Sequence, residues 1–226
     1  MRGEISTGKF AKRHPLDWYA EQGWEWDQIV RAIGVHEELR EGVAIYDPCA
    51  GFGHSGSRLA EWGFAERIFL SDLVENVAYD DFEVRPTFFS ADFLEVTEPP
   101  AKQCSIWFNP PYSYIPGIAE AFVRHALKLA THRVVAILPN KWLAPGKDVK
   151  RWSNRSRLFR IDHPPQTVLH FSERPSMPPG DRIHLMGNRA FRGGMVDYCA
   201  IVWDVRRPTA PGDTRTIWLP PLAEEL

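Results

Sequence analysis

The sequence predicts an α/β protein built on a mostly parallel sheet of seven strands with helices on both faces. Short apolar runs alternate with helical segments from residue 43 onwards. Each run is almost entirely apolar, which is typical of parallel strands that are covered on both faces. Four successive runs are followed directly by Asp or Asn, which places polar side chains along one edge of the sheet.

The expected strands are short apolar segments that end at turns or polar residues. In chain order they are Val43–Tyr46, Arg67–Leu70, Thr87–Phe89, Cys104–Phe108, Val134–Leu138, Gln166–Phe171 and Val196–Trp203. One or two helices are expected over Leu16–Ile33, and single helices over Ser55–Trp62 and Ile118–Ala130. The last helix carries apolar residues at helical spacing, at Ala119, Phe122, Val123, Ala126 and Leu127.

These elements divide the chain into three parts. A helical N-terminal segment spans residues 1–40, the main α/β domain spans 41–204, and an extension spans 205–226. The extension contains several prolines, so it is expected to wrap the surface or fray.

Composition limits the class of protein. Of the 226 residues, 44% are hydrophobic, which is enough for a full core. The formal net charge of −2 means that any nucleic-acid surface has to be a local patch. The 3 cysteines lack metal-ligand spacing, so we expect neither a zinc site nor a disulfide framework, and a reducing cytoplasm is indicated. No apolar stretch approaches the roughly 18 residues that a membrane span needs.

The four polar residues at the strand ends are Asp47, Asp72, Asp92 and Asn109. Ligands of open α/β sheets bind at the carboxyl ends of the strands, so this row outlines a candidate site. Asp is also common after strands as a cap or turn residue, but that explanation is weaker for four in succession.

A glycine-rich loop, Gly51–Gly56, follows the first strand and matches the dinucleotide fingerprint G-x-G-x-x-G. Alone it would suggest a nicotinamide cofactor, with Asp72 as the ribose ligand. The preceding Asp47-Pro48 argues otherwise, because a carboxylate there would repel a pyrophosphate. S-adenosylmethionine carries an ammonium group and no phosphate. Asp72 could hold its ribose and Asp92 could accept from its adenine amino group.

The tetrapeptide Asn109-Pro110-Pro111-Tyr112 ends the fourth strand. Two prolines donate no N–H, so the backbone carbonyls stay out of the sheet ladder. The Asn109 amide oxygen and the Pro110 carbonyl can accept from the two hydrogens of an amino group, and Tyr112 offers a ring for stacking. A Pro-Pro turn without further function is the plainer alternative.

Together, Asp47–Gly53 and the tetrapeptide resemble the amino-group DNA methyltransferases, and the loop form is most similar to the adenine-N6 branch. Glu173–Ser176 and Asp197–Trp203 resemble the closing strands of small phage and prophage adenine methyltransferases. The resemblance covers about residues 15–204, with the gamma order of motifs. Asp17–Tyr19 loosely resembles the family's segment that closes over the cofactor, although Ala20-Glu21 stands where Thr-Pro usually follows.

The resemblance implies a Rossmann-like S-adenosylmethionine-dependent methyltransferase fold and transfer of a methyl group to adenine N6 of a base flipped out of double-stranded DNA. It implies cofactor-binding roles for Tyr19, Asp47, Pro48, Ala50, Gly51, Gly53, Asp72, Leu73, Asp92 and Phe93. It implies catalytic roles for Asn109, Pro110, Pro111 and Tyr112, with no metal, in a monomer or weak dimer in a bacterial or phage-infected cytoplasm.

Three alternatives remain open. The same fold could act on an RNA base or a protein glutamine, whose amide nitrogen poses the same chemical problem. Cytosine N4 also fits, although Ser more often stands at the position of Asn109 in such enzymes. A non-catalytic binding module with this fold is the third alternative, and the intact loop and tetrapeptide argue against it.

Two basic segments within residues 141–195 are candidates for phosphate contacts. The first, Lys141–Arg160, contains seven cations, and its Trp142 and Trp152 could stack on or wedge between bases. The second is Arg182–Arg192, in a glycine-rich stretch. A solvated helix face and a plain strand connection are the respective alternatives.

Overall fold

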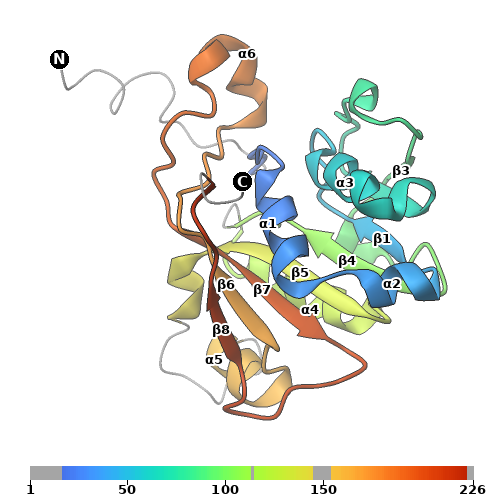
Figure 1. Cartoon of the computed structure of the whole chain (residues 1–226), viewed down its shortest axis with the longest axis vertical. Helices are drawn as coiled ribbons and strands as arrows, with labels where there is room; N and C mark the ends of the chain where they lie inside the picture. Colours follow the sequence, from blue (N-terminus) through green and yellow to red (C-terminus); the bar gives the residue numbers. More distant parts are fainter. Residues whose placement is uncertain (1–16, 113–114, 145–153, 223–226) are drawn as a thin grey trace.

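A computed structural model describes residues 17–112, 115–144 and 154–222. It contains one eight-stranded sheet with strand order β3-β2-β1-β4-β5-β7-β6-β8 (Figure 1). The strands are β1 (Ala44–Asp47), β2 (Ile68–Asp72), β3 (Thr87–Ser90), β4 (Cys104–Phe108), β5 (Arg133–Pro139), β6 (Thr167–His170), β7 (Tyr198–Asp204) and β8 (Arg215–Trp218). Only β7 runs antiparallel to its neighbours, β5 and β6, so the mostly parallel α/β sheet is confirmed.

The expected number of seven strands is wrong, because β8 adds an eighth. It pairs in parallel with β6, with Val168 opposite Thr216. This strand lies within the 205–226 extension, which we expected to wrap the surface or fray. Its four residues are mostly exposed, and only Ile217 and Trp218 are apolar, so Arg215–Trp218 lacks the continuous apolar run that identified the other strands.

The helices are α1 (Trp24–Ile33), α2 (His36–Glu41), α3 (His54–Leu59), α4 (Ile118–Leu129), α5 (Arg155–Arg157) and α6 (Ile183–Met186). Short 3-10 turns lie at Ala65–Arg67, Tyr79–Asp81, Phe93–Glu95, Asn140–Leu143, Gly180–Arg182 and Gly187–Arg189, and π-helical turns at Ala60–Phe64 and Leu158–Asp162. Among the described residues, no helix is long and apolar enough to cross a membrane.

Helices cover both faces of the sheet, as expected, and the alternation along β5 shows how. Val134 and Ala136 face a cluster with Val123 of α4. Val135 and Ile137 face the opposite cluster, with Ile29 of α1 and Leu59 of α3. Burial on both faces therefore explains why β5 is apolar throughout.

The strand order reverses between β1 and β4, which are neighbours although the chain visits β2 and β3 between them. In open α/β sheets the crevice for ligands lies at this reversal, outside the carboxyl ends of the strands. Asp47 ends β1 and Asn109 directly follows β4, so the two sides of the reversal carry two of the predicted site residues.

Candidate functional site

Asp47 holds the glycine loop in place from the end of β1. Its Oδ1 accepts from the Cys49 N–H at 2.8 Å, and its Oδ2 accepts from the Ser55 hydroxyl at the start of α3. The carboxyl is 2% exposed. Both oxygens accept from the glycine loop, so Asp47 fixes the shape of this loop rather than offering an open carboxylate.

Two glycines let the loop turn sharply above the sheet. Gly51 and Gly53 have φ angles of 49° and 86°, the left-handed region that favours glycine. A Cβ at Gly51 would lie 3.0 Å from Nε1 of Trp18, so the absence of a side chain also lets Trp18 pack over the loop. Trp18 lies 5.0 Å from the Phe52 ring.

Asp72, at the end of β2, joins the same loop from the neighbouring strand. Its Oδ2 accepts from the Gly51 N–H at 3.0 Å and its Oδ1 accepts from the Leu73 N–H at 2.7 Å. Carboxylate oxygens have further lone pairs, so Asp72 can still accept from hydroxyl groups of a ligand. The structure thus brings Asp47, Gly51 and Asp72 together, as the sequence predicted.

The site is electrostatically acidic. The pKa of Asp47 is raised to about 8, mainly by burial and in smaller part by the nearby carboxyl groups of Glu21 and Asp72, whereas the hydrogen bond from Ser55 lowers it. Burial also raises the pKa of Asp72. Within the described part of the chain, no lysine or arginine is among the groups that shift either pKa. A cationic ligand group would be stabilised here, whereas a pyrophosphate would be repelled.

Asn109 presents its amide at the reversal point. Its Oδ1 accepts from the Tyr112 hydroxyl, and its Nδ2 donates to Oε2 of Glu21 at 3.1 Å. The Sδ of Met177 lies 3.7 Å from Nδ2 and 3.6 Å from the Tyr112 hydroxyl oxygen. The amide therefore faces an acceptor with its nitrogen and a donor with its oxygen.

Two segments far apart in the sequence meet over the tetrapeptide. The Ala20 N–H donates to the Pro178 carbonyl at 3.0 Å, and the Gly180 N–H donates to the Trp18 carbonyl at 3.0 Å. Gly180 lies so close to the Trp18 ring that a Cβ would be 2.3 Å from it. The N-terminal segment thus joins the connection between β6 and β7, whose outer part carries α6 (Figure 1).

The remaining predicted residues are placed as follows. Tyr19 is half-buried and forms an isolated β-bridge with Pro179. Leu73 and Asp92 are exposed at the carboxyl edge, and Oδ1 of Asp92 caps the Leu94 N–H at 3.0 Å. Phe93 is 1% exposed, and its ring packs on Tyr46 and Phe122 in the core. Of the others, Pro48, Ala50 and Pro110 are buried and Pro111 is half-buried.

Sequence reasoning missed Glu21, Ser55 and Met177, although all three contact predicted site residues. Glu21 is 7% exposed, and its Oε1 also accepts from the Trp26 Nε1–H at 3.3 Å. Its backbone carbonyl lies 2.6 Å from Nδ1 of His54. An acidic residue in place of the family's Thr-Pro was the one available signal for Glu21.

The two basic segments differ in how they are placed. In Lys141–Arg160, Trp142 is 5% exposed in the core, so the expectation that it stacks on or wedges between bases is wrong. Arg155 lies over the Trp142 ring and Arg157 pairs with Asp162 at 3.0 Å. Lys147, Lys150, Arg151 and Trp152 lie outside the described residues. Lys141 and Arg160 of this segment are exposed, as are His184, Arg189 and Arg192 in the second segment, Arg182–Arg192.

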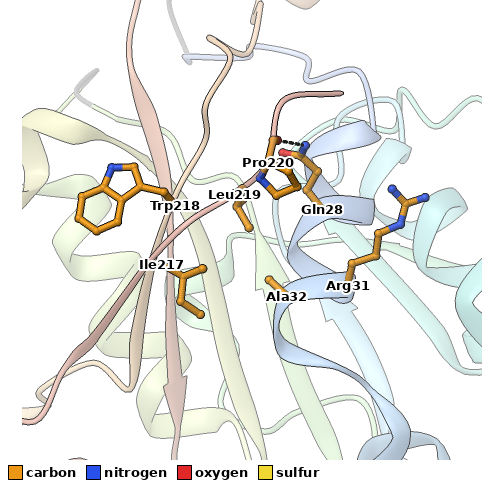
Figure 2. Close-up of a pocket in the computed structure, with 7 residues that line it drawn as sticks. All are labelled: Gln28, Arg31, Ala32, Ile217, Trp218, Leu219 and Pro220. Carbon is orange, nitrogen blue, oxygen red and sulfur yellow. Dashed lines mark hydrogen bonds between the residues drawn. The ribbon is translucent and has the colours of Figure 1, made fainter. Parts of the chain in front are cut away.

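An open groove of about 380 Å³ lies between α1 and β8 (Figure 2). Its lining is mostly apolar and includes Ile217 and Leu219, and the Gln28 side chain donates to the Pro220 carbonyl at 2.9 Å. It contains none of the predicted site residues. In the described ranges, no group of three or more His, Cys, Asp or Glu side chains could hold a metal ion.

No protein-family model and no curated protein matches the sequence. Solved structures are similar in fold. A protein assigned as a class I S-adenosylmethionine-dependent methyltransferase from Listeria monocytogenes has a TM-score of 0.58 at 10% identity, over 85% of this chain and 64% of that one. The type IIG restriction endonuclease BpuSI has a TM-score of 0.55 at 16% identity, over 83% and 25%. A protein assigned as an RNA methyltransferase from Pyrococcus horikoshii has a TM-score of 0.56 at 15% identity, over 87% and 91%.

This chain therefore spans less than two thirds of the first two proteins. At such identities the likeness is one of fold. The chain has the α/β fold of S-adenosylmethionine-dependent methyltransferases.

Proposed function

We propose that this protein transfers a methyl group from S-adenosylmethionine to an exocyclic amino nitrogen, and specifically to adenine N6 in DNA. The observation that carries the proposal is the Asn109 amide at the strand-order reversal. Its nitrogen is tied to Glu21 at 3.1 Å, so its oxygen is the atom left to accept from a substrate. The phage-type adenine-N6 resemblance of the sequence supports the finer assignment.

The residues present fit the cofactor. Asp72 lies beside the glycine loop, where it can accept from the ribose hydroxyls, and exposed Asp92 can accept from the adenine amino group. Burial raises the pKa of the Asp47 and Asp72 carboxyls, and a cationic ligand group beside them would favour their ionised forms. When bound, S-adenosylmethionine supplies an activated methyl group on a positively charged sulfur. Trp18 belongs to Asp17–Tyr19, which by resemblance closes over the cofactor within the N-terminal segment, and it packs against Gly51 of this loop.

The difficulty of the reaction lies with the nucleophile, because an exocyclic amino nitrogen donates its lone pair into the ring. Asn109 Oδ1 and the Pro110 carbonyl accept from its two hydrogens, which favours a pyramidal nitrogen with a free lone pair. The Tyr112 hydroxyl has to leave Asn109 Oδ1 when the amino group arrives, and the Tyr112 ring then stacks on the base. As the nitrogen bonds to the methyl carbon, the carbon–sulfur bond breaks, and the positively charged product nitrogen then loses its proton readily to water. Catalysis is thus alignment and fixed hydrogen bonding, without a general base before the transfer.

A target base in duplex DNA has to be flipped into this site. The exposed residues Arg189 and Arg192 lie on the connection that also carries Met177 beside Asn109. This connection is therefore placed for phosphate contacts near the tetrapeptide.

An RNA base is the second candidate. The chain spans 91% of the protein assigned as an RNA methyltransferase, but only 25% of the restriction endonuclease.

Mass spectrometry of nucleosides tests both candidates at once. The wild-type chain and the control variant Asn109→Ala would be expressed in parallel in a host that lacks adenine methylation. DNA and RNA from each culture would then be digested separately to nucleosides. We expect N6-methyladenine in DNA from the wild type only. Methylation confined to RNA would favour the second candidate, and unmodified DNA and RNA would contradict both.

A further inference from the structure

We infer that Glu21 is a positioning residue that fixes which way the Asn109 amide faces. The inference rests on the proposed function, since it assigns Glu21 a part in the same methyl transfer. Glu21 lies 88 residues before Asn109 and bonds to it directly at 3.1 Å.

An asparagine amide is nearly symmetric in shape, but its two ends are opposite in hydrogen bonding. Catalysis requires the oxygen to face the substrate amino group. If the amide turned over, its nitrogen would offer two donors to that amino group, and no acceptor would remain. Some neighbour therefore has to distinguish the two orientations.

An ionised carboxylate only accepts hydrogen bonds, so Glu21 can make this distinction. With the amide as placed, Nδ2 donates to Oε2 of Glu21. With the amide turned over, Oδ1 would lie against the same carboxylate oxygen, and two acceptors would repel. The Tyr112 hydroxyl favours the same orientation only until the substrate displaces it. Glu21 remains in place throughout.

Glu21 is itself held firmly. It is 7% exposed, its Oε1 accepts from the Trp26 Nε1–H at 3.3 Å, and its carbonyl lies 2.6 Å from Nδ1 of His54. It also follows Ala20, whose N–H donates a hydrogen bond to the Pro178 carbonyl. The carboxylate is therefore pre-organised by α1, α3 and the β6–β7 connection before any substrate binds.

Glu21→Gln tests the inference because glutamine keeps the size of the side chain but both accepts and donates. Single-turnover methyl transfer at saturating cofactor should fall on the order of tenfold to a hundredfold. The dissociation constant for S-adenosylhomocysteine should stay within about twofold of wild type. In an Asn109→Ala background, Glu21→Gln should change the rate by less than about twofold, because two residues that act through one contact are not additive.

Glu25→Gln is the matched control. Glu25 is buried like Glu21, but its Oε2 accepts from the Gly23 N–H at 2.9 Å and not from the tetrapeptide. It should transfer methyl groups at nearly the wild-type rate. The inference would be overturned if the rate loss of Glu21→Gln added in full to that of Asn109→Ala in the double variant. If Glu21→Gln bound S-adenosylhomocysteine more weakly but transferred methyl groups at an unchanged rate, the inference would also be overturned, since Glu21 would then be a cofactor ligand.

A second measurement needs neither cofactor nor activity. The chain has five asparagines, so the side-chain amide signals in an asparagine-labelled NMR spectrum are few, and Asn109→Ala identifies the one of interest. That signal should move in Glu21→Gln and stay in Glu25→Gln. An unmoved signal would overturn the inference. If the wild type methylates nothing, the proposed function fails alone and the NMR result still decides the role of Glu21.

Discussion

Replacing Asn109 by Asp should damage this site more than a simple comparison of the two side chains suggests. Asp keeps an acceptor oxygen for the substrate, so on the sequence alone it should be the mild substitution and Ala the severe one. In the structure, however, the new carboxylate would face Glu21 at the distance where Nδ2 now donates, 3.1 Å.

The size of the effect follows from that distance. Two charges 3.1 Å apart repel by about 5 kcal/mol at an effective dielectric constant of about 20. The pair can avoid this by binding one proton. Protonating a carboxyl with an ordinary pKa near 4 costs about 1.4 kcal/mol per pH unit, or about 4 kcal/mol at pH 7. Asn109→Asp should therefore lose about 4 kcal/mol of stability at pH 7, or about 8–16 °C in Tm for a chain of this size.

The pH dependence distinguishes this from ordinary loss of contacts. In the folded variant the carboxyl pair that shares a proton has a pKa above that of the same groups in the unfolded chain. The loss of stability is therefore small near pH 4 and grows as the pH rises. Asn109→Ala loses a hydrogen bond to a charged group, about 1.5–3 kcal/mol, with no such growth. Thermal unfolding of both variants and the wild type at pH 5, 6 and 7 measures the difference.

The double variant Asn109→Asp with Glu21→Gln exchanges the two chemical groups. Its glutamine donates to the aspartate, so the contact is restored with the roles reversed and an acceptor again faces the substrate. Stability and methyl transfer should both exceed those of Asn109→Asp alone. The reasoning is refuted if Asn109→Asp loses no more stability at pH 7 than at pH 5, or if the double variant is no better than the single one.

The other expected outcomes concern the cofactor, DNA and pH. Asp72→Ala should weaken binding of S-adenosylhomocysteine in calorimetric titration by about 1.5–3 kcal/mol, as for a lost hydrogen bond to a charged group, and an unchanged affinity in a folded variant would contradict the assignment. Replacing Arg189 and Arg192 by Ala should lower the slope of log DNA affinity against log salt by about one unit per lost contact, whereas replacing exposed Arg215 by Ala should leave the slope unchanged. Equal slopes in both variants would exclude Arg182–Arg192 from phosphate contacts. Burial raises the pKa of Glu25 to about 8, so the folded chain binds this proton more tightly than the unfolded chain and stability falls as the pH rises from 6 to 8. Urea unfolding should show a smaller fall for Glu25→Gln, and an identical pH profile would mean that Glu25 titrates normally.

The parts of the fold that could be predicted are those with a strong local signal. The apolar run Cys104–Phe108 has the same bounds as β4 because every residue in it is buried. The strand Arg215–Trp218 was missed because an exposed edge strand needs no apolar run, and its pairing with β6 depends on residues nearly fifty positions earlier. The predicted helix Ser55–Trp62 likewise changes to a π-helical turn after Leu59, with Gly63 at a φ of 102°.

The candidate site divides in the same way. Asp47, Asp72 and Asn109 were found because each follows an apolar strand, and parallel strands end at one edge. Trp142 was misjudged because a tryptophan among cations in the sequence can still turn into the core, as it does against Phe159. Glu21 was not assigned because its contact with Asn109 exists only after folding.

Under the proposed function, the arrangement around Asn109 would link closure over the cofactor to catalysis. The segment that carries Trp18 over the glycine loop also carries Glu21 against the tetrapeptide, only three positions later. The same segment is paired with Pro178 and Gly180, next to Met177, so the substrate side of the site is tied to it as well. A displacement of residues 17–21 would therefore open the loop and release the Asn109 amide together. Because Trp18 and Glu21 lie on the same short segment of chain, the loop contact and the orientation of the Asn109 amide would be lost together. A substitution within the tetrapeptide would affect only the amide.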